Sequence, residues 1–414
     1  MPDYQTATVL HDLMAERGRD IIYQQARLTC GLVDVRLPSE EKYRPKPARQ
    51  RNEKPIEQRK IPREVGTVQV KKGGIRSLGV TSDGATRRAG SAVQFAKGKY
   101  EYKMIEGELE IPIGLAMTAQ GGAGIDFTVE QLSTLGSQFG AHLDRCVAGN
   151  QLDAPSATMS AGATTFTVAD PSGFIEGEEY DHYNSGDVYQ QTFRVTNIAP
   201  PTASLLGDFT ITVETAVSIA VATSAKVYQS GGGSSTNRLA SLSDVCTSAT
   251  SMYGLSTTNF PSGISVALSS WDNVSGRRMS DTIAVLSGSR PTHICTNSLG
   301  ASKIINASLA LRRFNSGDVD VYGGVTPKFD DLPIVVSEQL SGRKMLFINA
   351  EKCFLHTFWD FEFQADGVGN GGFGASVLKL SEDKTSYKGL ATGGFEFVVN
   401  HRRAFGEFTG VGDA

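Results

Sequence analysis

The sequence has little of what secreted, membrane-spanning or zinc-binding proteins need. Its five cysteines are scattered and odd in number, and none has CxxC or Cys/His spacing. We therefore expect reduced thiols rather than a disulfide framework, and no zinc site. No apolar run approaches the ~18 residues of a membrane span, and the N-terminus lacks the apolar core of a signal peptide. These absences favour a protein with no membrane segment that folds in a reducing compartment.

Catalytic motifs are equally scarce. The six histidines show no HxH or HExxH pattern, and no GxSxG surrounds any serine. The GxGxxG match that begins at Gly367 lacks a βαβ unit and a following helix, so a loop is favoured. The acidic pairs Asp318/Asp320 and Asp330/Asp331 lack EF-hand spacing and fit solvated turns better than calcium sites. We predict a protein that is not an enzyme, with no catalytic, cofactor-binding or metal-binding residues and no cofactor.

The net charge of −4 conceals two strongly basic segments. Lys42–Arg63 carries nine basic residues against two glutamates, and Lys71–Lys99 carries seven against Asp83 alone. Prolines punctuate Pro38–Val65, which we expect to be an extended segment that cannot bury itself. Solvated linkers would explain both segments, and so would arms that reach acidic neighbours or nucleic acid.

A long amphipathic helix organises the rest of the chain. Over Asp126–Asn150 the apolar residues recur at three- and four-residue steps, which predicts one buried stripe. Thr128 and Gln131 fit a capping box, and Gly149-Asn150 provides a stop, so about twenty helical residues are expected. Two further glycines four residues apart, Gly136 and Gly140, indicate a face that another backbone approaches closely. The stripe consists of Leu132, Leu135, Phe139, Leu143 and Val147.

The N-terminal half also predicts a helix, a hairpin, a strand and a β module. Residues 5–26 form an amphipathic pattern, and the β patterns at Thr67–Val70 and Ala92–Lys103 bracket a basic, glycine-rich tip. Ile105, Leu109, Ile111 and Ile113 alternate with glutamates, as in a half-buried strand. Ala154–Gln229 has an all-β profile and ends at the linker SGGGSS. Its expected strands are Thr164–Val168, Thr192–Ile198, Phe209–Val213 and Ala225–Tyr228.

The C-terminal half mixes helices and strands without βαβ regularity, so the predicted class is α+β. The expected helices are Arg238–Tyr253 and Gly300–Arg313, and the expected strands are Pro291–Cys295, Lys344–Ile348, Cys353–Gln364 and one within Thr385–Phe408. In the last of these Phe395, Phe397 and Val399 face inward. The aromatic residues near Trp359 are expected in the core, His142 beside the long helix, and His356 on the outer face of its strand.

The order of these elements resembles one known family. A basic arm, a glycine-rich hairpin, a strand and the helix DFTVEQLSTLGSQFGAHLDRCVAGN are followed by PTHICTNSLGASKIINASL and GGVTPKFDDLPIVVSEQL. KMLFINAEKCFLHTFWDFEFQ and TSYKGLATGGFEFVVNHRRAFGEFTG complete the series. This order is similar to that of the major capsid proteins of tailed bacteriophages, the Hong Kong ninety-seven type. The resemblance covers about four-fifths of the chain, and it rests on the order of the elements rather than on an invariant sequence motif.

The resemblance implies a capsid fold with an N-arm, an E-loop hairpin, a long spine helix, peripheral and axial domains, and a small all-β insertion domain. The implied segments are 1–65 for the N-terminal helix and basic N-arm, 66–103 for the E-loop, 104–153 for the peripheral strand and spine helix, 154–230 for the insertion domain, 231–342 for the axial domain, and 343–414 for the return strands of both domains.

The resemblance also implies the function and the partners. Copies of the chain would assemble into hexamers and pentamers of an icosahedral phage head around double-stranded DNA, which the shell contacts non-specifically. The chain would be located in the virion and assemble in the host cytoplasm, with a portal and a separate scaffold or decoration protein as further partners. No large cleaved prosegment is expected. The candidate subunit contacts are Arg44, Arg49, Arg51, Arg59, Lys60, Arg63, Lys71, Lys72, Arg76, Arg87 and Arg88.

One alternative function stays open at this point. A nucleic-acid-binding protein could use the basic arm and hairpin for phosphate contacts, and its affinity for DNA would fall steeply with salt. Apart from Tyr43 the basic segments lack interleaved aromatic residues, which disfavours stacking on single strands.

Overall fold

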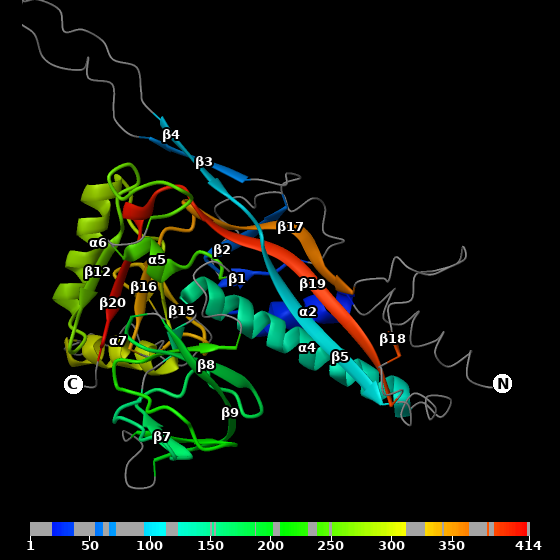
Figure 1. Cartoon of the computed structure of the whole chain (residues 1–414). Helices are drawn as coiled ribbons and strands as arrows, with labels where there is room; N and C mark the ends of the chain where they lie inside the picture. The colour runs from blue at the N-terminus through cyan, green and yellow to red at the C-terminus, as the bar shows by residue number, and fades with distance from the viewer. Residues whose placement is uncertain are drawn as a thin grey trace, which may run out of the picture.

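The chain has the mixed α+β architecture that the sequence predicts, with three sheets and a separate hairpin among the described residues (Figure 1). This computed structural model describes residues 19–36, 54–60, 66–71, 95–112, 123–149, 151–152, 155–186, 188–201, 208–230, 238–247, 251–311, 328–341, 343–363, 379–380 and 385–411. The Gly367 loop, the pair Asp318/Asp320 and residues 5–18 of the first predicted helix lie outside them.

The central sheet joins strands from the two ends of the chain. Its order is β1 (Val33–Asp34), β2 (Ile56–Lys60), β17 (Cys353–Phe363), β19 (Ser386–Val399) and β18 (Lys379–Leu380). On the side of β19 opposite β17, β5 (Lys103–Pro112) pairs antiparallel with β19 from Lys103 to Pro112. The predicted alternation of β5 is confirmed, because Ile105, Leu109 and Ile111 are buried.

Strand β2 contradicts the expectation that the proline-rich segment cannot bury itself. It pairs parallel with β17, and Ile56, Glu57 and Gln58 are all buried. The prediction is wrong for this strand because its polar side chains find partners within the fold. The Gln58 amide donates to the Thr357 hydroxyl at 2.8 Å and accepts from the Arg36 backbone N–H at 2.9 Å.

Two helices pack on one face of this sheet. The long helix α4 (Ala123–Ala148) has 26 residues, about 39 Å, and α2 (Arg19–Thr29) crosses it. The predicted apolar stripe of α4 is confirmed, since Leu132, Leu135, Phe139, Leu143 and Val147 are buried. The capping-box prediction is wrong: the helix begins at Ala123, so Thr128 lies inside it and is buried. The predicted stop is confirmed by Gly149, whose φ is +143°.

The predicted hairpin is present and separate from the central sheet. Strand β3 (Gly66–Lys71) pairs antiparallel with β4 (Phe95–Tyr100), from Gly66 opposite Tyr100 to Lys71 opposite Phe95. Figure 1 shows the hairpin beyond one end of the central sheet, with β4 leading into β5. The end of the hairpin at Lys71 and Phe95 is therefore the end remote from β5.

The predicted β module forms a sheet with its own core. Its order is β6 (Gln151–Leu152), β11 (Lys226–Gln229), β8 (Glu179–Tyr183), β9 (Tyr189–Ala199), β10 (Phe209–Val213) and β7 (Thr165–Val168). The four expected strands are confirmed to within a few residues. Strand β8 was missed because Tyr180, Asp181 and His182 are buried in succession, without alternation. Strand β6 precedes Ala154, where the module was expected to begin.

A third sheet, the C-terminal sheet, contains β12 (Ile264–Ala267), β20 (Gly406–Thr409), β16 (Met345–Ile348), β13 (His293–Thr296), β15 (Leu332–Val336) and β14 (Lys328–Phe329), in that order. Helices α6 (Asn273–Ser287) and α7 (Ser298–Leu311) contribute to its core. Helix α7 and strands β13 and β16 were predicted, whereas α6 and β15 were not. Asp330 and Asp331 form the expected exposed turn, with φ of 49° and 67°.

The predicted helix over Arg238–Tyr253 is much shorter in the structure. Helix α5 spans only Leu242–Cys246, because the capping box of Ser241 and Asp244 begins it late and an extended Thr247 ends it. Tyr253 lies between Met252 and Leu255, which pair with each other in an isolated antiparallel β-bridge, and its φ is 54°. The residues near Tyr253 therefore form a turn rather than the end of a helix.

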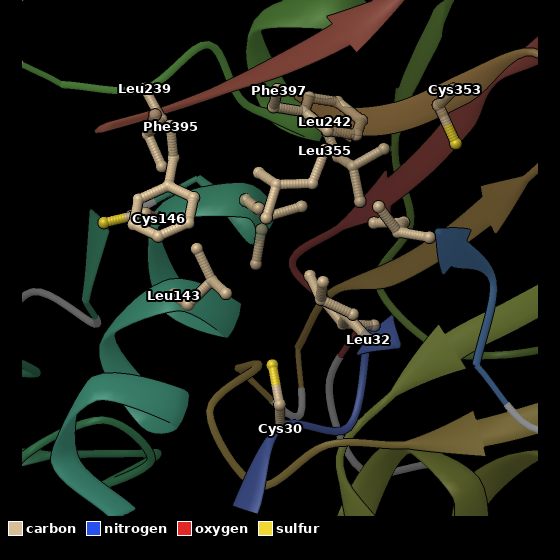
Figure 2. Packing of buried hydrophobic residues seen from close by; sticks show 14 of the residues in the cluster. Cys30, Leu32, Leu143, Cys146, Leu239, Leu242, Cys353, Leu355, Phe395 and Phe397 are labelled. Carbon is tan, nitrogen blue, oxygen red and sulfur yellow. The ribbon is translucent and has the colours of Figure 1, made fainter. Parts of the chain in front are cut away.

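The main core lies where α4, the central sheet and α5 meet (Figure 2). Leu143 and Cys146 of α4 approach Phe395 of β19, and Leu242 of α5 lies near Phe397. The inward-facing prediction for Phe395, Phe397 and Val399 is confirmed, since all three are fully buried.

Candidate subunit-contact surfaces

The sheet face opposite α4 carries an exposed apolar patch. We call Tyr102, Met104, Trp359 and Leu390 the outer-face patch. Tyr102, Met104 and Leu390 are 46, 49 and 41% exposed. The Tyr102 and Trp359 rings lie 4.5 Å apart, and a Cβ on Gly394 would stand 2.6 Å from the Trp359 ring. Gly394 is therefore required for Trp359 to lie flat on the sheet. Tyr102, Met104 and Trp359 lie together around Gly394, while Leu390 lies on the same face opposite Glu108. Exposed apolar side chains gathered on one face are typical of interaction surfaces.

An acidic row borders the outer-face patch along β5. Glu106, Glu108 and Glu110 are exposed on that same face, and the Lys388 ammonium lies 3.1 Å from Glu108 and 3.8 Å from Glu110. An exposed ion pair of this kind contributes only about 0–1 kcal/mol to stability. Because one lysine stands against three carboxylates on this face, the row remains acidic and is suited to a basic partner.

The hairpin is anchored at its base by aromatic side chains. The Tyr100 ring packs edge-on against His356 and is tilted against Tyr253. The Lys99 N–H donates to the Tyr253 carbonyl at 3.0 Å. His356 lies on the face of β17 away from α4, as predicted, since it is opposite Glu396 and not opposite the inward Phe395 or Phe397, but it is fully buried there by Tyr100. At the other end of the hairpin Phe95 is 60% exposed.

The structure places three of the eleven candidate contact residues. The Arg59 guanidinium pairs with Glu57 at 3.1 Å and lies over the Phe354 ring at 4.8 Å. The Lys60 ammonium pairs with Asp360 at 2.5 Å. Both side chains therefore have partners within the chain, with exposed fractions of 24% and 41%, and their contact with a neighbour stays a prediction. Lys71 ends β3. The other eight candidates lie outside the described residues.

The last turns of α4 connect three parts of the fold. The buried Asp144 carboxylate accepts from the backbone N–H groups of Gly31, Leu32 and Val33 and from the Ser337 hydroxyl. Through these bonds Asp144 holds the residues that follow α2 against α4, and it holds α4 against the end of β15. Burial raises the pKa of Asp144.

The same turns of α4 hold the β module, since the side-chain oxygen of Gln229 lies 2.7 Å from His142 Nδ1 and 2.8 Å from the Arg145 guanidinium.

The buried titratable groups serve packing. His142 lies beside the helix as predicted, with its Nε2 at 3.3 Å from Cys146 Sγ, and burial lowers its pKa to about 4. Burial raises the pKa of Cys146 to about 12. All five cysteines are free and buried. In the described part of the chain, no cluster of three or more His, Cys, Asp or Glu side chains could hold a metal ion.

The described helices include none that is both long and apolar enough to cross a membrane.

Sequence reasoning missed the outer-face patch and the Asp144 contacts. One signal for the patch was present, because Met104 alternates with the buried residues of β5, and Tyr102, just before the strand, continues that alternation. Asp144 carried a signal too: a carboxylate within the apolar stripe region of a helix needs several donors if it is buried.

Known structures resemble this chain over most of its length at low identity. The capsid of a native GTA particle matches with a TM-score of 0.48 and 9% identity, covering 91% of this chain and 95% of that chain. A cyanophage A-1(L) capsid matches with a TM-score of 0.46 and 10% identity, covering 85% and 89%. A virus-like particle from Pyrococcus furiosus matches with a TM-score of 0.41 and 9% identity, covering 95% and 98%. No family model matches the chain, and no curated protein does. Because these TM-scores lie below 0.5, the function has to be inferred from the chain's own geometry.

Proposed function

We propose that the chain is a shell-forming capsid subunit of the Hong Kong ninety-seven type. One observation, the arrangement of three parts of the fold, carries the proposal. The long helix α4 lies along the central sheet, and a basic hairpin projects from one end of that sheet. The C-terminal sheet, with its own helices, lies at the C-terminal end of α4. The elements follow one another in the order that the resemblance implies.

Under this proposal the parts of the molecule have distinct roles. The central sheet with α4 is the peripheral domain, the C-terminal sheet with α6 and α7 is the axial domain, and the β module is the insertion domain. The hairpin β3–β4 is the E-loop, and residues 1–65 contain the N-arm. Copies form hexamers and pentamers of an icosahedral phage head enclosing double-stranded DNA, assembled in the host cytoplasm with a portal and a scaffold or decoration protein.

The charge distribution supports contacts between copies. The segment Lys71–Lys99 is strongly basic, and the exposed row Glu106, Glu108 and Glu110 is acidic. A basic loop of one copy that meets an acidic surface of the next gains attractive energy during encounter, and the outer-face patch supplies apolar area to bury. The internal ion pairs of Arg59 and Lys60 make these two residues less suited to the alternative, in which the basic segments bind nucleic acid.

Imaging by negative stain combined with sedimentation would test the proposal on the chain expressed alone, at low and high salt. We expect closed shells or capsomer rings. A monodisperse monomer that binds DNA with a steep salt dependence would instead support the nucleic-acid function. A monomer that does neither, and that no scaffold protein brings into shells, would refute the capsid proposal.

A further inference from the structure

Three tyrosines, which we call the tyrosine cluster, gather on the face of the β module that is turned away from its own core. Tyr183 of β8 stands opposite Tyr189 of β9, and their rings lie 5.7 Å apart at an angle of 74°. Tyr183 also packs edge-on against Tyr228 of β11, with the ring centroids 5.5 Å apart. Val227, the residue before Tyr228, belongs to the core of the module, and side chains alternate along a strand.

The cluster is anchored on one side and open on the other. The Tyr228 side chain is 3% exposed, whereas Tyr189 is 53% exposed. Figure 1 shows the β module at the end of the molecule remote from the hairpin β3–β4. The exposed ring is therefore held by a buried one, and it lies on a part of the chain that stands apart from the basic hairpin.

A β-bulge brings the exposed ring onto this face. The register of β9 against β8 shifts after Gln191, which leaves Gln190 as an extra residue. In a regular strand Tyr189 and Gln191 would point to one face and Thr192 to the other. The extra residue instead turns Tyr189 to the face of Thr192, opposite Tyr183. Bulges that re-aim a side chain in this way are over-represented beside functional sites.

A relay of hydrogen bonds fixes the polar atoms beside the exposed ring. The Thr192 hydroxyl donates to the Asp181 carboxylate at 2.7 Å, and the Tyr189 hydroxyl lies 3.0 Å from the Thr192 oxygen. Because the Thr192 proton is committed to Asp181, Tyr189 is the donor in the second bond. The phenol oxygen of Tyr189 keeps its lone pairs and can accept from a ligand. Asp181 is buried and acts by setting the direction of the relay.

The hydroxyl of Tyr183 adds a donor next to this acceptor. Within the described part of the chain it has no hydrogen-bond partner. Burial and the neighbouring Asp181 carboxylate raise the pKa of Tyr183 above its ordinary 10, so the phenol keeps its proton at neutral pH. The cluster therefore presents a donor at Tyr183 and an acceptor at Tyr189, on two rings that meet at a steep angle.

The charged side chains near the cluster occur in opposite pairs. Lys226 stands opposite Tyr183 and lies on the same face as Asp181. Further along this face Glu179 stands opposite Arg194. Because two acids lie beside two bases, net charge selects neither an anion nor a cation, and a neutral ligand is favoured.

We propose that the tyrosine cluster binds a neutral hexose unit of a polysaccharide. A pyranose carries hydroxyl groups on adjacent carbons, and these match the donor of Tyr183 and the acceptor of Tyr189. It also has a face of C–H groups, whose partial positive charge suits the negative π face of an exposed ring. Forming a shell does not require such a site, so the inference goes beyond the proposed function and gives the β module a recognition role of its own.

Binding to immobilised polysaccharides tests the proposal on the full chain. The chain is mixed with beads that carry dextran, α-mannan or β-galactan, three neutral polymers with different linked hexoses, and with heparin beads as a charged polymer. Depletion of the chain from solution gives an apparent affinity. We expect binding to at least one neutral polymer and a preference for it over heparin.

Two variants then assign the binding to the cluster. Tyr183→Phe removes only the donor hydroxyl and should weaken binding by about 2- to 12-fold, the equivalent of one neutral hydrogen bond. Tyr189→Ala removes the exposed ring and should weaken binding further. The matched control is Tyr102→Phe, which removes the hydroxyl of a tyrosine that is 46% exposed on the outer-face patch, and it should leave binding unchanged.

The other outcomes overturn the proposal. These are no binding to any of the three neutral polymers, binding to heparin alone, equal binding by Tyr189→Ala and the original chain, and an equal loss in Tyr102→Phe and Tyr183→Phe. Unfolding does not account for a loss in Tyr183→Phe, because its ring contacts remain, and thermal melts of each variant verify this. Each of these results leaves the shell function standing, since shells of the same chains are imaged separately.

Discussion

Two glycines on α4 set the distance between the long helix and the N-terminal helix. A Cβ on Gly136 would stand 2.6 Å from the Ile22 carbonyl oxygen, and a Cβ on Gly140 would stand 2.7 Å from that of Ala26. Both neighbours are backbone atoms, so a side chain cannot simply rotate away. The close approach predicted from the spacing of these glycines is confirmed.

We expect Gly136→Ala and Gly140→Ala each to destabilise the chain. The gain in helix propensity is about 1 kcal/mol, while overpacking against a backbone costs about 1–3 kcal/mol and α2 would have to move. Thermal unfolding followed by circular dichroism measures the effect. The matched control is Thr134→Ala, at an exposed position of the same helix, which should be neutral or stabilising. A gain in stability for either glycine variant would contradict the close packing of α2.

Glu396 predicts a pH dependence at the scale of one side chain. Burial raises the pKa of this glutamate from its ordinary 4.5 to about 8, although its carboxylate accepts from the backbone N–H groups of Ala240 and Phe397. The folded state therefore keeps a proton that the unfolded chain releases. The stability contribution is fully present below pH 4.5 and is lost as the pH rises through about 8.

The variant Glu396→Gln should remove this part of the pH dependence, because the amide oxygen can still accept both hydrogen bonds while the group no longer titrates. The measurement is the unfolding midpoint of both proteins between pH 5 and pH 9. We expect the variant to gain stability relative to the original chain as the pH rises. Asp144 also has a raised pKa, and it is present in both proteins, so its effect cancels in the comparison. Parallel curves would contradict the prediction.

At the scale of elements, a buried arginine holds together α5, the loop that follows it and the 3₁₀ turn η5 (Arg402–Ala404). The Arg402 guanidinium donates to the carbonyl oxygens of Asp244, Val245, Phe260 and Thr247, at distances between 2.7 and 3.3 Å. Its acceptors are backbone carbonyls that lie in fixed directions. A planar group with several donors fits this arrangement, whereas an ammonium does not.

Arg402→Lys should therefore loosen the segment between α5 and Phe260. Hydrogen bonds to a charged group contribute about 1.5–3 kcal/mol each, and lysine can replace only part of them. We expect faster amide hydrogen exchange over residues 244–260 and a lower unfolding midpoint. Arg403→Lys, at the exposed neighbouring position, is the control and should leave exchange there unchanged. Equal exchange in the two variants would show that the segment is held by its apolar contacts instead.

The elements also show what could be predicted from sequence. Periodicity identified α4, β5 and the inward residues of β19, because each has one apolar face against one core. It failed for β2, whose buried Gln58 and Glu57 are polar and are satisfied in part by residues distant in sequence, Thr357 for Gln58 and Arg36 for both. It failed for α6 although two signals were present: Asp272 caps its N-terminus and Gly288 ends it in the left-handed region, at a φ of 76°. The alternation in β5 indicated the part of the outer-face patch at Met104, but the rest depends on the pairing of β5 with β19 and on Trp359 lying over Gly394.

At the scale of the whole molecule, the distribution of charge divides the chain into parts that attract each other. Each basic segment carries a large excess of positive charge, and Lys388 pairs with two of the three glutamates of the acidic row on β5. The described strands of the hairpin point away from that row, so under the proposed function the attraction would act between copies. Salt screens charges that are separated by more than about 8–10 Å at physiological ionic strength. The rate of assembly should therefore depend on salt more strongly than the stability of the folded chain does.

Neutralising the acidic row tests this division. We expect the triple variant Glu106→Gln, Glu108→Gln, Glu110→Gln to assemble several-fold more slowly at low salt, and to lose most of its salt dependence, because electrostatic steering acts on the rate of encounter. Light scattering during assembly at two salt concentrations measures both effects. The matched control removes three exposed carboxylates elsewhere, through Asp281→Asn, Glu338→Gln and Glu351→Gln, and so makes the same change in net charge. If the control slowed assembly as much as the triple variant, net charge rather than the β5 row would govern the encounter. If neither changed the rate, the contacts would depend on apolar burial at the outer-face patch alone.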